Sequence, residues 1–316
     1  MRSETLNFLE HEFAPNEIAL VREHRPYKIP RGYTQWNRLS AAVGSGLAMY
    51  RDESTARQTI DQATYLVNNR LALWFLQAAP IYALKTELFQ AFDHTDVSVD
   101  KGLLADLHPP IPTFLLLFPC NSLVSPDKSP LDWVVVHLTS RDNMEASHGE
   151  GFGYVLPDLQ AEDNAPFNLH WGGYDASDTT WFGGSGIDES GAILQPKRSL
   201  GRTAMNEADR LFTDRVRSIV IQVMLTLTYR PDLMEQPVGT ARAHINRRPA
   251  KASTVLSPRW LSTPSVVERR TAVKGIGHHA SPTTHWRRGH WRRTVVGPRD
   301  AAQRKWVWIK PTLVGQ

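Results

Sequence analysis

The chain has 316 residues, of which 41% are apolar and 22% are charged; this is ordinary for a folded globular protein and excludes disorder along the whole length. The single cysteine, Cys120, excludes an intramolecular disulfide and favours a reducing compartment. The first residues are polar and acidic, and no apolar run reaches the roughly 18 residues of a membrane span, so we expect a cytoplasmic protein without membrane contact.

The net charge of +4 conceals a strong asymmetry along the chain. Residues 242–316 hold 16 of the 36 Lys and Arg residues and only two acidic residues, Glu268 and Asp300, which is a balance of +14; residues 1–241 carry −10. This split predicts a basic segment that contacts a polyanion or an acidic partner. Docking of the basic segment onto the acidic body of the same chain explains the asymmetry equally well.

The N-terminal third is predicted to be helical. Apolar residues recur at helical spacing within 17–25, 33–50 and 53–93. The middle of the third segment is apolar nearly all round, which indicates burial within a bundle. Pro80 lacks an amide hydrogen, so we expect it to end one helix and start another, with the sequence IYALKTELFQAF.

The middle of the chain changes to the period of β-strands. Short apolar runs between turn residues predict strands at 112–120, 132–140, 151–158, 167–175 and 179–184. The first two are expected to be buried and joined by a loop, and the three that follow are expected to form a meander of antiparallel strands. A long amphipathic helix follows at about 204–229, and Pro231 stops it.

The C-terminal part is expected to be basic and rich in β-structure. Residues 236–284 contain only short apolar islands and are predicted to form a long loop or arm. Order is expected to return in two strands, within 291–296 and 304–315, joined as a hairpin across GPRDAAQ.

The elements together predict an α+β fold. It comprises an N-terminal helical block, a central and mostly antiparallel sheet, one long packing helix and the basic C-terminus. The corresponding regions are residues 1–100, 101–235 and 236–316, and we expect them to form one composite globular unit.

Motifs of catalysis are absent from the sequence. It contains no phosphate-binding loop, no nucleophile elbow and no paired-cysteine zinc motif, so we expect neither an enzyme nor a cofactor nor a metal. Histidines remain as one lead, because five of the 12 fall within residues 242–316: His244, His278, His279, His285 and His290. They suit a metal site or a histidine-based nuclease; hydrogen bonding and stacking is the alternative role.

The run HWRRGHWRR at 285–293 is the strongest candidate for a binding surface. Arginine presents a flat fork of donors to phosphates and carboxylates, and tryptophan offers a large face for stacking. Two further tryptophans alternate in KWVWIKP and are expected on a neighbouring strand. The predicted binding residues are His285, Trp286, Arg287, Arg288, Gly289, His290, Trp291, Arg292, Arg293, Trp306 and Trp308. The alternative is a ladder of Trp and Arg that packs the hairpin onto the body.

The C-terminal pattern resembles that of a family of phage, plasmid and bacterial proteins, which includes the type V-A anti-CRISPR protein that blocks biogenesis of the Cas nuclease. The family pattern is R-R-G-H-W, a variable loop, and a strand that ends in W-x-x-P. The matching residues are Arg287, Arg288, Gly289, His290 and Trp291, followed by Trp308 and Pro311. The segments LHPPIPTFLLLFP and LTLTYRPDL are similar to family segments in the same order.

The resemblance implies a non-catalytic binding protein in the cytoplasm of a bacterial host cell. It implies recognition of the N-terminal part of a Cas effector during synthesis at the ribosome, followed by loss of the message. The basic, Trp-rich end then suits a contact with the ribosome, RNA or the nascent chain. Two alternatives remain: an RNA-binding protein of a mobile element, and a ribonuclease-like toxin that uses His285 or His290.

Overall fold

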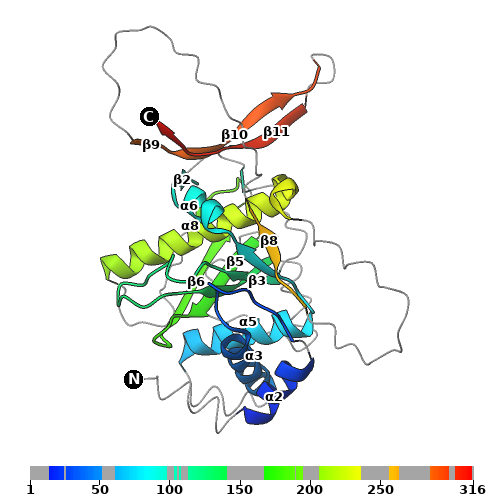
Figure 1. Ribbon diagram of the computed structural model, residues 1–316. Helices are drawn as coiled ribbons and strands as arrows, with labels where there is room; N and C mark the ends of the chain where they lie inside the picture. The colour runs from blue at the N-terminus through cyan, green and yellow to red at the C-terminus, as the bar shows by residue number, and fades with distance from the viewer. Residues whose placement is uncertain are drawn as a thin grey trace, which may run out of the picture.

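The computed structural model describes most of the chain. The described residues are 14–24, 26–51, 61–97, 103–104, 107, 113–140, 167–188, 190–194, 206–235, 256–262, 285–298 and 303–314. The strand predicted at 151–158 and most of the segment 236–284 lie outside them. Figure 1 shows a central layered body with a separate β-ribbon above it.

One large sheet forms the centre of the described structure, with the strand order β7-β6-β5-β4-β3-β1-β8. The strands are β1 (Ile81–Leu84), β3 (Thr113–Leu117), β4 (Trp133–Ser140), β5 (Phe167–Tyr174), β6 (Thr180–Ile187), β7 (Ile193–Leu194) and β8 (Arg259–Leu261). From β3 to β7 each strand pairs antiparallel with the next, which confirms the predicted, mostly antiparallel sheet. At the other edge, β1 runs parallel to both β3 and β8.

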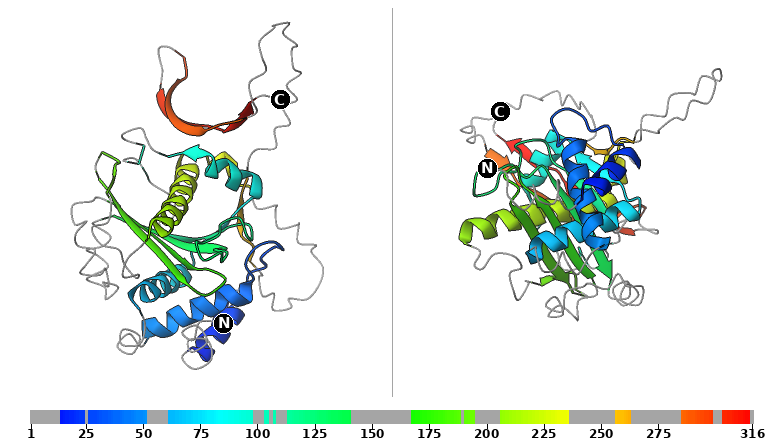
Figure 2. Two further views of the ribbon diagram at one scale, coloured as in Figure 1. Left: turned by 90° about the vertical axis from the view of Figure 1, so that its left-hand side faces the viewer. Right: turned by 90° about the horizontal axis from the view of Figure 1, so that it is seen from below.

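Helices cover both faces of the sheet (Figure 2). On one side lie α2 (Pro15–His24), α3 (Trp36–Arg51) and α5 (Gln62–Leu76); on the other lie α6 (Thr86–Asp93) and α8 (Glu207–Tyr229). The long helix α8 begins at a capping box, in which Asn206 and Asp209 each accept a hydrogen bond from the other's backbone N–H. It ends just before Pro231, as predicted.

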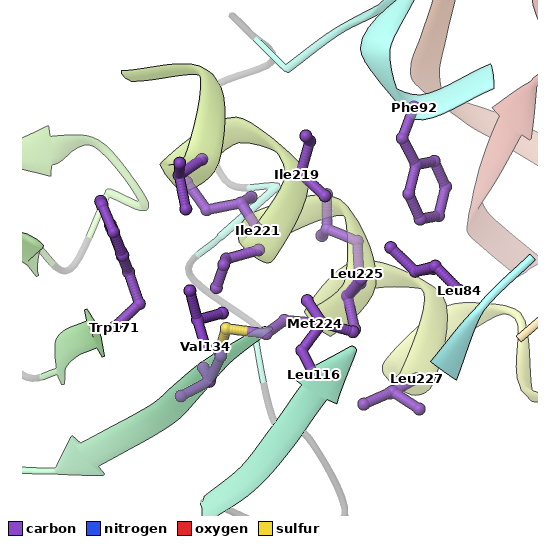
Figure 3. Close-up of a cluster of buried hydrophobic side chains, with 14 of the residues drawn as sticks. Leu84, Phe92, Leu116, Val134, Trp171, Ile219, Ile221, Met224, Leu225 and Leu227 are labelled. Atoms are coloured by element: carbon purple, nitrogen blue, oxygen red, sulfur yellow. The ribbon is translucent and has the colours of Figure 1, made fainter. Parts of the chain in front are cut away.

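Each face of the sheet has its own hydrophobic core. Under α8, Met224 and Leu225 pack with Leu116 and Val134, which point from β3 and β4 (Figure 3). The alternate residues of the same strands, such as Leu115, face α5 and α3. Burying one such aliphatic side chain contributes about 1.5–3 kcal/mol, so burial on both faces explains why these strands are apolar throughout rather than alternating.

Two expectations about the edge of the sheet are wrong. IYAL begins no helix: it is the buried strand β1, and the helix that follows it is only α6. Ala78, at a φ of 53°, lies in the turn between α5 and β1 and leads the chain into the sheet. The segment 236–284 also contributes a strand, β8, which the sequence did not indicate and which pairs with β1.

The C-terminus forms the predicted hairpin, which is extended by a third strand and accompanied by a second strand pair. Strands β10 (Gly289–Val296) and β11 (Gln303–Ile309) pair antiparallel, and β2 (Thr95–Asp96) adds to β10 in parallel. Strands β9 (His285–Arg287) and β12 (Thr312–Val314) form a second, shorter pair. Elements from the three predicted regions therefore share sheets, while the boundaries between the regions stay a prediction.

The described helices include none that is long and apolar enough to cross a membrane.

Candidate functional site

The C-terminal strands β9, β10, β11 and β12 form one curved ribbon, which we call the basic ribbon. Figure 2 shows that its convex side faces the body. Gly289 begins β10 at the point of closest approach, where its N–H donates to the carbonyl oxygen of His94 at 3.0 Å. A Cβ at this position would lie 2.5 Å from Thr95 Oγ1 and 2.6 Å from Pro311 Cδ. Only glycine fits between the ribbon and β2 without displacing a neighbour.

Tryptophans attach the basic ribbon to the body. Trp308 packs edge-to-face on Phe92 of α6, with 5.5 Å between ring centroids, and its Nε1–H donates to Thr95 Oγ1 at 3.3 Å. Trp291 lies beside Tyr229 at the end of α8, with centroids 6.3 Å apart. The exposed fractions of Trp291, Trp306 and Trp308 are only 5%, 8% and 6%. These indoles belong to the core under the ribbon.

The structure brings the predicted site residues together in the ribbon but separates their roles. Trp291, Trp306 and Trp308 face inward and offer no stacking surface to a partner, and Gly289 is buried with them. His290 is half-buried, whereas Arg288, Arg292 and Arg293 are exposed. His285, Trp286 and Arg287 form β9, and their side chains lie outside the described residues.

The exposed surface of the ribbon is cationic. Its exposed basic side chains are Arg288, Arg292, Arg293, Arg304, Lys305 and Lys310. None of the six forms an ion pair with a carboxylate in the described part of the chain. The described contacts between the ribbon and the body are aromatic contacts, backbone hydrogen bonds and the hydrogen bond from Trp308 to Thr95, so carboxylates in the described part of the body do not neutralise these side chains. Sequence reasoning omitted Arg304, Lys305 and Lys310, although all three flank the alternating tryptophans of KWVWIK.

Register places the cations on both faces of the ribbon. Trp291 stands opposite Trp308, and Arg293 opposite Trp306, on the face toward the body. On the outer face, Arg292 lies opposite Val307. The outer face therefore combines charge with apolar area, a mixture that suits nucleic acid as well as an acidic peptide.

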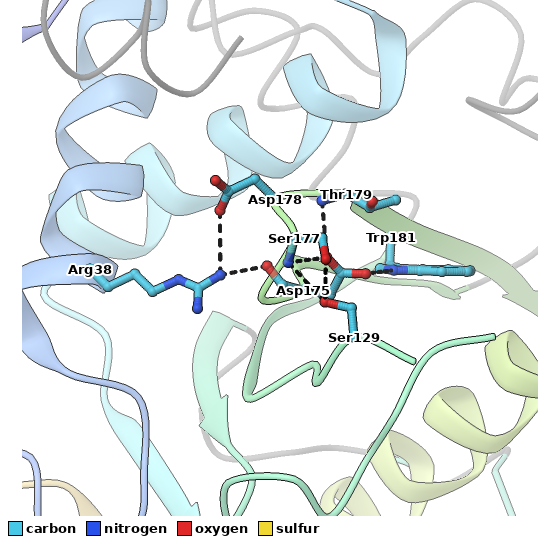
Figure 4. A network of polar contacts seen from close by, with 7 residues as sticks. All are labelled: Arg38, Ser129, Asp175, Ser177, Asp178, Thr179 and Trp181. Carbon is cyan, nitrogen blue, oxygen red and sulfur yellow. Dashed lines mark hydrogen bonds and ion pairs between the residues drawn. The ribbon is translucent and has the colours of Figure 1, made fainter. Parts of the chain in front are cut away.

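A second polar cluster lies at the turn between β5 and β6, and it is structural (Figure 4). The buried carboxylate of Asp175 accepts hydrogen bonds from Ser177 N at 2.9 Å, Thr179 N at 3.0 Å and Trp181 Nε1 at 3.0 Å. Arg38 of α3 donates to the carbonyl oxygen of Asp175 and closes the turn onto the helix. Both carboxylate oxygens are occupied, so this aspartate is not a free acid or base.

The described residues include no group of three or more His, Cys, Asp or Glu side chains that could hold a metal ion. The two histidines considered for a nuclease lie on different strands, His285 in β9 and His290 in β10.

Fold and ribbon together define an α+β protein that carries a cationic β-ribbon on a layered body. Residues 82–316 match the model of the AcrVA2-like family, described as the anti-CRISPR type V subtype A2 family. The match spans most of the chain, from β1 to the end of the ribbon, and the protein belongs to this family. No curated protein and no solved structure matches the chain. Membership confirms the resemblance found in the C-terminal motif and supports an anti-CRISPR function with a Cas-related target.

Proposed function

We propose that this protein binds the N-terminal part of a type V Cas effector while the effector is being synthesised, and lowers its expression through loss of the message. The family supports a Cas-related target. The C-terminal motif supports action during synthesis, because the resemblance that it carries is to a protein that blocks biogenesis of the nuclease. Under this proposal the protein acts by binding, without catalysis of its own.

The observation that carries the proposal is the set of exposed cations on the basic ribbon. They have no partner carboxylate among the described residues, and the buried indoles of Trp291 and Trp308 hold the ribbon in place. A surface fixed in this way loses little conformational entropy on binding. Ribosomal RNA, the message or an acidic stretch of nascent chain would each supply the missing negative charge.

The same cations support a second candidate, an RNA-binding protein of a mobile element without peptide specificity. The two candidates differ in what the protein reads: the encoded peptide or the nucleotide sequence. A ribonuclease that uses His285 or His290 is a third candidate. It can be distinguished from the other two, because substituting the catalytic histidine would abolish cleavage of the message but not binding.

The test uses bacterial cells that express a tagged type V Cas effector together with this protein. One effector gene is recoded with synonymous codons at its start, which keeps the peptide and changes the RNA. Another carries compensating frameshifts, which keep most of the RNA and change the peptide. Effector protein and message are measured for each gene. Loss that follows the peptide supports the proposal, and loss that follows the nucleotide sequence supports the RNA-binding alternative. Unchanged message and protein for the unaltered gene overturn both.

The ribbon's part is tested with matched charge-removal variants. The ribbon variant replaces Arg292, Arg304 and Lys305 with glutamine. The control replaces Lys28, Arg31 and Arg210, which are exposed cations on the body. We expect the ribbon variant to lose repression and ribosome association while the control keeps both. Equal repression by the two variants would remove the ribbon from the mechanism.

A further inference from the structure

A row of polar side chains crosses the sheet on the face toward α5, away from the basic ribbon. The register aligns Thr113 of β3 with His137 of β4, His137 with His170 of β5, and His170 with Gly184 of β6. Thr113 Oγ1 and His137 Nδ1 are 2.5 Å apart and share a hydrogen bond. The row borders an apolar part of this face, since Leu115 and Val135, two residues along their strands, are core.

Arg70 of α5 projects onto this row from above the sheet. Its exposed fraction is 6%, and burial lowers the pKa of its guanidinium to about 10, so the group stays charged at neutral pH. Nη2 lies 3.3 Å from His170 Nδ1. Nε is buried and has no hydrogen-bond partner in the described part of the chain. The Nη2 group of the guanidinium therefore donates a hydrogen bond, whereas the Nε–H donor has no acceptor in the described part of the chain.

No negative charge accompanies this arginine among the described residues. None of their carboxylates forms an ion pair with it. The neighbouring histidines are neutral, because burial and the charge of Arg70 lower the pKa of His170 to about 3 and hold the pKa of His137 well below its usual range. A guanidinium cannot accept a hydrogen bond, so Nδ1 of His170 accepts and its proton resides on Nε2. The row thus holds one positive charge without a counter-charge among the described residues.

A buried charge without a counter-charge is strongly destabilising, whereas a paired one is tolerated. His137 is the least buried polar side chain of the row. We propose that Arg70, His137 and His170 form a binding site for a small oxyanion, a phosphate or a carboxylate. The guanidinium fork suits such a planar or tetrahedral group of oxygens. This site is separate from the ribbon, and the proposal does not depend on the proposed function.

The test is a thermal melt of the full chain titrated with inorganic phosphate against chloride at matched ionic strength and pH. A ligand that binds only the folded state raises Tm in a saturable manner, whereas general salting-out stabilises every variant alike and does not saturate at millimolar concentration. We expect a saturable rise for the native sequence and none for Arg70→Met, which removes the charge and keeps the length of the stem. Arg38→Met is the control, because Arg38 pairs with Asp178 at the β5–β6 turn, and it should keep the full response.

Phosphate binding is also measured directly by equilibrium dialysis with radiolabelled phosphate, so that a folding defect of Arg70→Met does not decide the question. Arg70→Lys serves as a second variant that keeps the charge but loses the fork; we expect its phosphate affinity to fall at least about tenfold, since one charged hydrogen bond of the fork is lost. Acetate in place of phosphate identifies a carboxylate site if it alone saturates. No saturable binding of either anion to the native chain, or undiminished binding to Arg70→Met, would overturn the proposal.

Discussion

Trp291 and Trp308 stand opposite each other in the register of β10 and β11, and their indoles stack with 6.4 Å between centroids and 26° between planes. Both rings then meet helices of the body, Trp291 at Tyr229 and Trp308 at Phe92. The pair joins the hairpin to helices that lie far away in sequence. The position of the cationic surface therefore depends on a buried aromatic contact rather than on charge.

Replacing Trp308 with alanine should release the ribbon. The change removes the stack on Trp291, the contact with Phe92 and the hydrogen bond to Thr95, and large-to-small changes of this kind cost about 3–5 kcal/mol. Amide hydrogen exchange should rise across β10 and β11 and stay unchanged in α3. Val295→Ala is the matched control in the same ribbon, because Val295 is 60% exposed and should change stability by less than about 0.5 kcal/mol. Unchanged exchange in Trp308→Ala would contradict the anchoring role.

The sequence predicted the ribbon itself but not which of its faces is buried. Alternation in KWVWIK is the same whether the tryptophans face a partner or the body, and the choice is made by α6 and α8, which no local pattern reveals. Among the predicted site residues whose side chains are described, Arg288, Arg292 and Arg293 are the exposed ones. The family motif identified the family correctly, because it depends on residue identity rather than on burial.

The central strands were predictable where they are long and β-branched, as in DWVVVHLTS. The helix prediction for IYAL was wrong because four apolar residues suit a helix and a strand equally, and because the helix-forming sequence TELFQAF follows soon after. Strand β8 was not predicted because its three residues lie in a polar segment and become a strand only through pairing with β1. One signal was overlooked: Arg70 shares the spacing i, i+4, i+7 with Leu66 and Leu73 and so belongs to the buried stripe of α5.

Two substitutions at Asp175, in the turn between β5 and β6, should lower the free energy of unfolding by different amounts. Asp175→Ala leaves the backbone N–H group of Thr179 and the indole N–H of Trp181 without their acceptor, whereas the N–H of Ser177 keeps Ser129 Oγ; each unsatisfied buried donor costs about 1–3 kcal/mol. Asp175→Asn keeps one oxygen for the two backbone donors but points an amide NH₂ at Trp181, so it should destabilise less than alanine. Urea denaturation measures both free energies of unfolding. Equal losses for the two variants would show that the backbone donors of the turn contribute nothing measurable through this side chain.

The buried histidines predict a loss of stability in acid. The folded-state pKa of His170 is about 3 and that of His137 is also lowered, while an unfolded histidine has a pKa of about 6.5. Between these values the unfolded chain binds more protons, so stability rises with pH and is lost as pH falls below about 6.5. Each histidine contributes a slope of roughly 1 kcal/mol per pH unit. His170→Gln should flatten the dependence measured by urea denaturation between these limits, and His24→Gln, an exposed control, should leave it unchanged.

The cations of the ribbon predict how binding should respond to salt. If the ribbon contacts RNA, each phosphate contact contributes about 0.7 to the slope of log K against log salt concentration for a single strand. Arg292→Gln with Lys305→Gln should therefore lower that slope by about 1.4 and weaken binding to all sequences alike. Fluorescence anisotropy with single-stranded RNA at several salt concentrations measures the slope, with Lys28→Gln and Arg31→Gln as the matched pair on the body. An unchanged slope in the ribbon variant, or a native chain without RNA affinity, would assign these exposed side chains to a protein partner, because an acidic peptide releases few condensed counterions when it binds.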